Sequence, residues 1–272
     1  MASGIGDAET LTTLHQAGRL DDLEISDWIN NTAVGAGLFD NPNTFIELRS
    51  PNVTSYTYSY DNPVAADKQL YLDTRSGPYS FASQTSVFWR YAQHDDGSVT
   101  GLQGTIDSSG YSDFTDEHTI TLNIYGTSGL KSVGRVVLDE NFIAKPTDNV
   151  YYSDPQDAAD IAAFIRELFD ALPSEGSEGA GLTPLNIAQN ATVEEISAYV
   201  TTMSDYAKGS VNHWSSSCRL ESCVDGEAKV VGMDNLYVVD GSIVPPLTVN
   251  PQMGIMIAAE RASEFILGAW SA

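Results

Sequence analysis

The sequence predicts an α+β fold in which an antiparallel sheet packs against helices. Between Phe45 and Val150, residues with high strand propensity form short runs that Gly, Asn, Asp and Pro interrupt, which is typical of antiparallel strands joined by turns. After Ser153 the apolar residues recur at helical spacing. With 272 residues, 42% of them hydrophobic, the chain can bury a substantial core in one large domain or two smaller ones.

Loops, short helices and then strands are expected in the first half of the chain. Residues 7–40 predict loops and short helices, with turns around Gly35-Ala36-Gly37. Alternation of apolar and polar residues predicts strands at Val53–Tyr60 and Thr119–Tyr125, and the apolar run Gly134–Leu138 predicts another. We expect these strands to form one antiparallel sheet.

A long helix is expected to follow the sheet. It begins at Pro155, because proline fits the first helical position and a capping residue precedes it. Its apolar stripe continues until Pro173 ends the helix. Residues 174–181 are rich in Ser, Glu and Gly and predict an exposed loop.

Two more helices and a short strand are expected in the last third. Thr192 and Glu195 have the spacing of a capping box, and the apolar stripe behind them comprises Ile196, Tyr199, Val200 and Met203. The run Leu236–Asp240 predicts a buried strand that ends at a carboxylate. Asn250 is expected to start the last helix, which Gly268 would close.

The charge of the chain excludes several classes of partner. There are 37 acidic and 13 basic side chains, which give a formal net charge of -24. Nucleic acids and anionic membrane surfaces are therefore not expected as partners, because both require clustered Lys and Arg. No apolar run approaches the roughly 20 residues that cross a bilayer.

Cysteines and glycosylation sequons favour an extracellular protein. Cys218 and Cys223 are close enough in sequence to form a disulfide, although two free thiols fit the spacing equally well. Sequons begin at Asn30, Asn52 and Asn190. An extracellular location also requires a secretion signal, and the N-terminal residues do not have the pattern of one.

Common catalytic motifs are absent from the sequence. There is no G-x-S-x-G elbow, no H-E-x-x-H motif and no G-x-G-x-x-G fingerprint. The four histidines are scattered without ligand spacing, so no metal site is expected. His213 is either a structural histidine or a proton acceptor. Asn250 is either an ordinary helix cap or a ligand contact, and Asp240 is either a turn residue or a cofactor contact.

The C-terminal part resembles the glucose–methanol–choline (GMC) flavin oxidoreductases. The segments that carry the resemblance are Asn212-His213-Trp214, Leu236–Pro245, Asn250-Pro251-Gln252 and the helix through Ala258–Ala262. His213 and Asn250 have the spacing of the family's catalytic pair. The Asn-His-Trp sequence is most similar to the flavin domain of fungal cellobiose dehydrogenases and related sugar dehydrogenases. Ser132–Leu138 resembles a strand of the family's substrate domain.

The resemblance implies an FAD-dependent oxidation of the anomeric carbon of cellobiose or a similar saccharide to a lactone. His213 would accept the hydroxyl proton and Asn250 would bind the same oxygen. Asn212 and Trp214 would contact the substrate. The residues implied to line FAD are Asp240, Gly241, Asn250, Pro251 and Gln252. The electron acceptor stays open among a cytochrome domain, a quinone and oxygen.

The start of the chain resembles the end of the family's second signature, at Ser3-Gly4-Ile5-Gly6. We therefore expect the C-terminal half of such an enzyme, from an incomplete gene model, an engineered fragment or an unusual splice product. Its expected parts are a partial FAD-binding segment at 1–44, a substrate-binding domain at 45–224 and a second FAD-binding segment at 225–272. This half alone is expected to bind FAD weakly or not at all and to expose an apolar face.

Two other functions fit the same sequence. One is a GMC oxidase that acts on alcohols or aryl alcohols. The other is a non-catalytic, β-rich carbohydrate-binding module, which would use neither His213 nor the last helix. For the tyrosines of the sheet region, we expect packing rather than a carbohydrate-binding platform; they are Tyr56, Tyr58, Tyr60, Tyr71 and Tyr79.

Overall fold

The computed structural model divides into two compact units. It describes residues 3–20, 23–81, 83–147, 149–172, 181–207 and 209–270, so the expected helix end at Pro173 and most of the expected loop at 174–181 lie outside the described residues. The first unit comprises Met1–Asn41, Lys131–Asp154 and Ser210–Ala272, and the second comprises Pro42–Leu130 and Pro155–Gly209. Residues 131–154 and 210–224 therefore group with the chain ends rather than with the middle of the chain.

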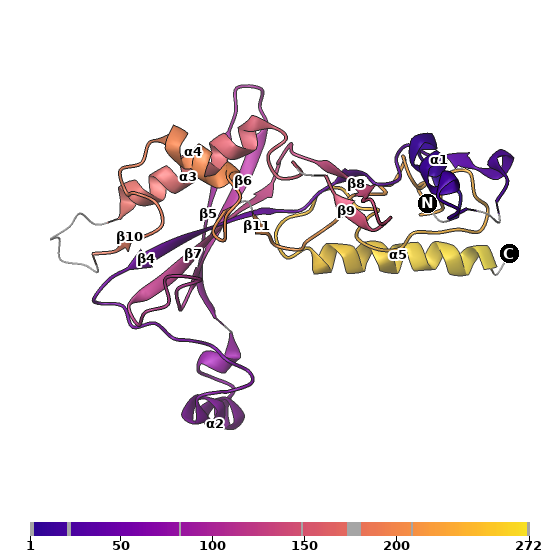
Figure 1. The fold of residues 1–272 in the computed structure, drawn as a ribbon. Helices are drawn as coiled ribbons and strands as arrows, with labels where there is room; N and C mark the ends of the chain where they lie inside the picture. Colours follow the sequence, from indigo (N-terminus) through magenta and orange to yellow (C-terminus); the bar gives the residue numbers. More distant parts are fainter. Residues whose placement is uncertain are drawn as a thin grey trace. The chain divides into compact units, whose positions relative to one another are not determined.

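The second unit is built on a six-stranded sheet (Figure 1). The strands, in spatial order, are β10 (Thr183–Pro184), β4 (Pro42–Arg49), β7 (Thr119–Ser128), β6 (Val99–Asp107) and β5 (Gln84–Gln93), and β11 (Gly209–Ser210) also pairs with β4. β4, β7, β6 and β5 pair in antiparallel register. This confirms the predicted antiparallel sheet and the strand expected at Thr119–Tyr125.

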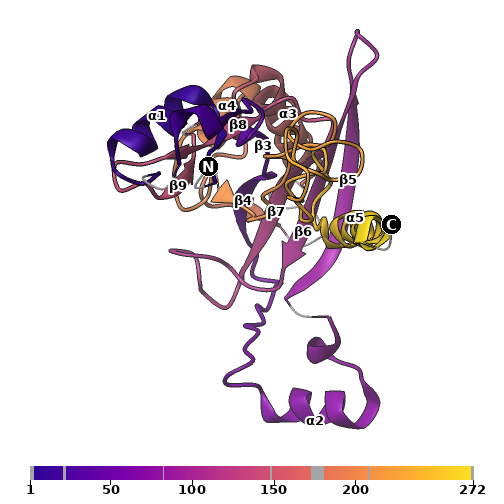
Figure 2. The ribbon, with the colours of Figure 1, turned by 90° about the vertical axis from the view of Figure 1, so that its right-hand side faces the viewer.

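Two helices pack on the apolar face of this sheet. They are α3 (Pro155–Ala171) and α4 (Val193–Thr201), which run side by side (Figure 1 and Figure 2). The ring of Phe88 occupies the space over Gly104 and its centroid lies 5.9 Å from that of Phe164 in α3. Ile46 and Ile124 of the sheet and Ile165 of α3 are completely buried. The fold class is therefore mixed, with helices covering an antiparallel sheet, as predicted.

The local start signals of both helices are confirmed. α3 begins at Pro155, and α4 begins after a capping box in which Thr192 and Glu195 bond each other's backbone N–H groups. One expectation for α4 is wrong. Met203 is 70% exposed, because the helix ends at Thr201 and Met203 lies beyond its apolar stripe.

The expected strand at Val53–Tyr60 is absent, and this segment instead leads into an arm. The arm carries α2 (Ala65–Thr74) and a short 3-10 helix (Pro78–Ser80) away from the sheet (Figure 1). The ring of Tyr58 lies 4.7 Å from that of Tyr60 and 4.8 Å from that of Tyr79. The tyrosines therefore pack on one another rather than on a sheet face, which supports packing as their role.

The first unit contains short strands and two longer helices. Its elements are β1 (Ile5–Gly6), α1 (Ala8–Gln16), a 3-10 helix (Ile25–Asp27), β2 (Ile29–Asn30), β3 (Ala36–Leu38), β8 (Gly134–Leu138), β9 (Ala144–Pro146) and α5 (Gln252–Trp270). β8 is the strand expected at 134–138, but it pairs with β3 and β9 rather than with the larger sheet. In the second unit, β7 ends at Ser128, and the next residue is Gly129. The φ of Gly129 is +71°, and a Cβ there would lie 2.0 Å from the carbonyl oxygen of Val99, so this turn requires glycine.

Two further expectations for this unit are wrong. Leu236–Asp240 is irregular backbone, because it pairs with residues 228–230 only through a single bridge between Lys229 and Tyr237, while its apolar side chains pack into a core. The last helix continues through Gly268 to Trp270, and an isolated glycine is tolerated within a helix. It begins at Gln252, so Pro251 rather than Asn250 stands directly before it.

Candidate active site

His213 and Asn250 lie next to each other in the first unit. The backbone N–H of Asn250 donates to Nδ1 of His213 at 3.4 Å, although 37 positions separate the two residues. The His213 ring is half-buried and the Asn250 side chain is exposed. In the neutral ring, the nitrogen that accepts this bond carries no proton, so Nδ1 is the basic nitrogen in this arrangement.

Both asparagines of the site adopt the left-handed backbone conformation. The φ of Asn212 is +59° and that of Asn250 is also +59°. Asparagine tolerates this region better than other residues that have a Cβ. The two turns therefore direct the chain so that residue 213 and residue 250 face each other, and Asn250 is not an ordinary helix cap, whose backbone would be extended.

The backbone after His213 forms hydrogen bonds with two segments that are distant in sequence, one on each side. Ser215 exchanges both backbone hydrogen bonds with Phe39, at 2.9 and 3.0 Å. On its other side, the N–H of Ser216 donates to the carbonyl of Gly241 at 3.0 Å, and the N–H of Cys218 donates to that of Ser242 at 2.9 Å. These bonds bring the turn that contains Gly241 beside the histidine segment.

Gly241 allows α5 to approach this turn closely. A Cβ at Gly241 would lie 3.0 Å from Cδ1 of Ile255 in the first turn of α5, and 3.6 Å from the carbonyl oxygen of Trp214. A larger residue at this position would push the start of α5 away. Asp240 is exposed, and its Oδ1 accepts the N–H of Ser242 at 2.8 Å, as in a tight turn.

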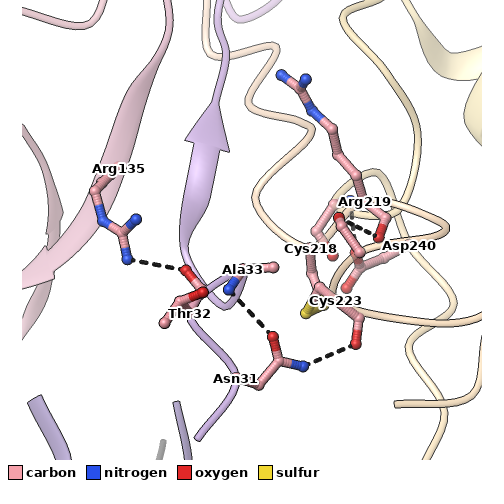
Figure 3. Close-up of a disulfide and its surroundings, with 10 residues drawn as sticks. Asn31, Thr32, Ala33, Arg135, Cys218, Arg219, Cys223 and Asp240 are labelled. Carbon is pink, nitrogen blue, oxygen red and sulfur yellow. Dashed lines mark hydrogen bonds between the residues drawn. A yellow bond between two sulfur atoms is a disulfide. The ribbon is translucent and has the colours of Figure 1, made fainter. Parts of the chain in front are cut away.

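A disulfide joins Cys218 and Cys223, which lie five positions apart at the two ends of one short loop (Figure 3). Cys223 is completely buried. The buried side chain of Asn31 donates to the carbonyl of Cys223 at 3.1 Å, and its own oxygen accepts the N–H of Ala33 at 3.1 Å (Figure 3). The loop that follows the histidine is therefore held by a covalent bond and by a buried amide.

The predicted site residues fall into three groups: residues that contact one another, residues at the start of α5, and exposed residues elsewhere in the first unit. His213 and Asn250 meet, and Gly241 contacts both the Trp214 segment and α5. Gln252 is exposed at the first position of α5, whereas Pro251 is buried and its carbonyl accepts the N–H of Ile255. Asn212 and Asp240 are exposed.

Two residues beside the site were not singled out by the sequence. Asp40 is 1% exposed, and its Oδ1 accepts the backbone N–H of His213 at 2.8 Å. The buried Tyr151 donates its hydroxyl to Oδ2 of Asp40 at 2.8 Å, and its ring centroid lies 6.1 Å from that of Trp214. The one available signal was an acidic residue directly after the apolar pair Leu38-Phe39, which is too common a pattern to identify a site.

The sequence also matches a known family model. Residues 131–259, which include His213, Gly241 and Asn250, match the model described as GMC oxidoreductase. Residues 131–259 of this chain are therefore similar to the C-terminal domain of GMC oxidoreductases. The family resemblance that the His213 and Asn250 segments indicate is therefore confirmed at the level of the family, whereas a specific likeness to cellobiose dehydrogenase is not shown.

Relatives of this GMC domain have different activities. (R)-mandelonitrile lyase 1 from Prunus serotina is 24% identical over 259 residues, which cover 89% of this chain and 41% of that protein. Mitochondrial choline dehydrogenase from Mus musculus is 29% identical over 139 residues, which cover 48% of this chain and 21% of that protein. The chain thus spans less than half the length of these relatives.

Solved structures show the same fold as this chain. Formate oxidase from Aspergillus oryzae RIB40, whose description concerns modification of its FAD, superposes with a TM-score of 0.70 and 17% sequence identity. The match covers 98% of this chain and 51% of that protein. This agreement concerns the fold rather than the substrate.

Proposed function

We propose that this chain supplies the substrate side of an FAD-dependent oxidoreductase that acts on a CH–OH group, with a saccharide as the substrate class. The observation that carries the proposal is the contact between two residues far apart in sequence, in which the backbone N–H of Asn250 donates to Nδ1 of His213. A carbohydrate-binding module would have no need for this contact. An alcohol or aryl-alcohol donor uses the same pair, so the substrate must be identified by profiling.

His213 is proposed to accept the proton of the substrate hydroxyl; at Nδ1 the substrate would replace the long 3.4 Å bond from the backbone N–H of Asn250. The exposed carboxamide of Asn250 is proposed to hold the same oxygen by a hydrogen bond. Removal of the hydroxyl proton makes the attached carbon a better hydride donor. General-base assistance of this kind contributes about 10²–10⁴-fold to the rate.

The residues around the start of α5 fit FAD. The first turn of this 19-residue helix presents N–H groups without helical partners, and its first two residues, Gln252 and Met253, are exposed. The positive end of a helix suits an electron-rich ring with carbonyl groups. Asp240, Gly241, Asn250, Pro251 and Gln252 are proposed to hold the cofactor here. FAD, when bound, would supply the acceptor for the hydride.

A saccharide is proposed on the strength of Trp214 and its surroundings. The indole is half-buried next to the reactive pair, and the ring of Tyr151 lies against it. A partly exposed aromatic face beside hydrogen-bonding amides suits a pyranose, which has an apolar face and a rim of hydroxyls. Asn212 and Trp214 are the proposed substrate contacts.

Much of α5 carries exposed apolar side chains. Ala262 is the one buried residue in this helix, while Met253, Met256, Ile257, Leu267 and Trp270 are each at least 64% exposed. Large exposed apolar surfaces mark interaction sites. This supports the proposal that further protein covers α5 in the FAD-loaded enzyme.

The test is the substitution His213→Gln in the FAD-loaded protein that carries this chain. We expect turnover of the best sugar or alcohol donor to fall by about 10²–10⁴-fold, while the flavin absorbance stays at its original intensity. His15→Gln, a change of the same kind in α1, is the control and should leave turnover unchanged. Full turnover by the His213→Gln protein would overturn the assignment.

A lyase is the second candidate, because (R)-mandelonitrile lyase 1 is similar over 89% of this chain. The same histidine can remove a hydroxyl proton from a cyanohydrin, and the C–C bond to cyanide then breaks without oxidation. Anaerobic mixing separates the two reactions. Donor oxidation bleaches the oxidised flavin in a single turnover, whereas release of cyanide and aldehyde with an unchanged flavin spectrum would favour the lyase.

An extracellular location is proposed from surface chemistry. The Cys218–Cys223 disulfide requires an oxidising compartment to persist. The asparagines of all three sequons, Asn30, Asn52 and Asn190, are exposed and accessible to glycosylation. Among the described residues, no helix has the length and hydropathy needed to cross a bilayer. Secretion by the native host, with a mass loss after glycosidase treatment, is the expected result.

A further inference from the structure

We propose that Asp40 is the positioning residue for His213. Its buried carboxylate fixes the backbone from which the imidazole faces Asn250. The inference rests on the proposed function of His213, and it adds a residue from another part of the chain to that site. Asp40 lies 173 positions before His213, between β3 and β4.

The carboxylate of Asp40 accepts hydrogen bonds at both of its oxygens. Oδ1 accepts the N–H of His213 at 2.8 Å and the N–H of Asn41 at 3.0 Å. Oδ2 accepts the hydroxyl of Tyr151 at 2.8 Å. Asp40 is 1% exposed, so water cannot replace these bonds easily. Bonds from N–H and O–H donors to a carboxylate are short and strong, and they hold three chain segments together.

The chemistry of the site requires a carboxylate rather than an amide. An asparagine side chain accepts at one oxygen only and presents N–H groups at its other end. If its oxygen faced the N–H of His213, its N–H₂ would face Tyr151, and the hydroxyl of Tyr151 would lose its acceptor. The reverse orientation would place donor against donor at His213. Asp40→Asn therefore keeps the shape of the side chain but loses the hydrogen bond to either the N–H of His213 or the hydroxyl of Tyr151.

The hydrogen bonds to Asp40 hold the backbone that carries the His213 ring. Asn212 is in the left-handed region, and both the N–H and the carbonyl of Ser215 bond the backbone of Phe39. The bond from the N–H of His213 to Asp40 fixes the residue between these two points. The direction of the imidazole follows from this backbone, because a side chain with few rotamers points where its backbone directs it. A shift of the ring by about 1 Å can cost roughly 10²-fold in rate.

Tyr151 links the same carboxylate to the proposed substrate side. Its hydroxyl bonds Oδ2 of Asp40, and its ring faces Trp214, which directly follows His213. Tyr151→Phe removes one hydrogen-bond donor to Asp40 and leaves both the ring and the charge of Asp40 in place. It is therefore a milder test of the same idea and should fold even if Asp40→Asn does not.

The experiment measures two quantities for Asp40→Asn and Tyr151→Phe. The first is the rate of flavin reduction in a single turnover of the FAD-loaded protein, with the substrate Kd from the same series. We expect Asp40→Asn to slow reduction by about 10- to 100-fold, with the Kd changed by less than about threefold, and Tyr151→Phe to slow it less. The matched control is Asp160→Asn, another buried aspartate, which lies in α3 of the second unit.

The second quantity is the amide proton shift of His213 in the ¹⁵N-labelled protein. A hydrogen bond to a carboxylate moves an amide proton downfield, so Asp40→Asn should move that resonance upfield. Tyr151→Phe removes a donor from the same carboxylate and should also shift the resonance. A role in folding alone would move neither this shift nor the reduction rate in the folded Tyr151→Phe protein. An unchanged rate and an unchanged shift in that protein would overturn the proposal.

The outcome separates this inference from the function on which it depends. If His213→Gln leaves turnover intact, the proposed function fails whatever Asp40 does. If His213→Gln abolishes turnover while Asp40→Asn and Tyr151→Phe behave as the parent protein, His213 remains the base and the positioning role of Asp40 alone is wrong.

Discussion

The two units of this chain hold their backbones in different ways. In the second unit, long antiparallel ladders and a continuous apolar layer between the sheet and α3 fix the chain. In the first unit, the segments around His213 and Asn250 are irregular, and single bridges, a disulfide and buried polar side chains hold them. The candidate chemistry lies in the irregular unit, where the backbone can place side chains that a regular strand would direct elsewhere.

Each unit also buries a carboxylate, and the two differ in their surroundings. Asp40 accepts two N–H groups and a hydroxyl. Glu47 of β4 is completely buried and accepts the hydroxyl of Thr121 and the N–H of Tyr111 at 3.0 Å. Burial raises the pKa of Glu47 from its ordinary value of 4.5 to about 7, with a smaller contribution from the nearby Asp107. Burial in the second unit therefore disfavours the charged form of Glu47.

The largest expected effect tests whether apolar packing dominates the second unit. Ile165→Ala removes a completely buried side chain from α3 and should cost about 2–5 kcal/mol of unfolding free energy. Urea unfolding measures the loss, and hydrogen exchange should show reduced protection in the second unit only. Val87→Ala, at a site that is 56% exposed, is the control and should cost far less. An equal loss of protection around His213 would show that the two units do not differ in this way.

The next effect sharpens the comparison of the two carboxylates. Because the folded state binds a proton on Glu47 more tightly than the unfolded state, stability falls as the pH rises from about 4.5 through 7. Glu47→Gln should remove this dependence, a difference of up to about 3 kcal/mol between pH 5 and pH 8. Urea unfolding at both pH values checks it, with Asp73→Asn on exposed α2 as the control. An identical pH dependence in Glu47→Gln and the parent protein would exclude Glu47 as its source.

The smallest effect concerns the irregular unit. Replacement of Cys218 and Cys223 by serine should destabilise the first unit by about 2 kcal/mol, because the short loop gains freedom when unfolded. Thermal unfolding followed through near-UV circular dichroism reports it. A reducing agent should lower the stability of the parent protein by the same amount and leave the double variant unchanged. A double variant as stable as the parent would mean that Asn31 and the core already hold this loop.

Local patterns in the sequence predicted the regular elements correctly. The proline start of α3, the capping box of α4 and the alternation in β7 each depend on residues within a few positions of one another. The family resemblance also predicted that His213 and Asn250 form a pair, and the structure brings the backbone of Asn250 into contact with the ring of His213. Local patterns failed at Val53–Tyr60 and Leu236–Asp240, where apolar or aromatic runs pack without a neighbouring strand.

The sequence by itself therefore determined the starts of α3 and α4, the central strand β7 and the family resemblance of the C-terminal part, because these depend on short-range periodicity and on motif residues. Only the tertiary structure decided that β8 pairs with β3 and β9, that Asn250 contacts the ring of His213, and that Asp40 accepts the backbone N–H of His213. The sequence of a strand does not say which other strand will pair with its edge, and the sequence around a carboxylate does not say whether it is buried. The hydrogen-bond partners of the strand edge and of the carboxylate come from distant segments, which only the folded chain brings together.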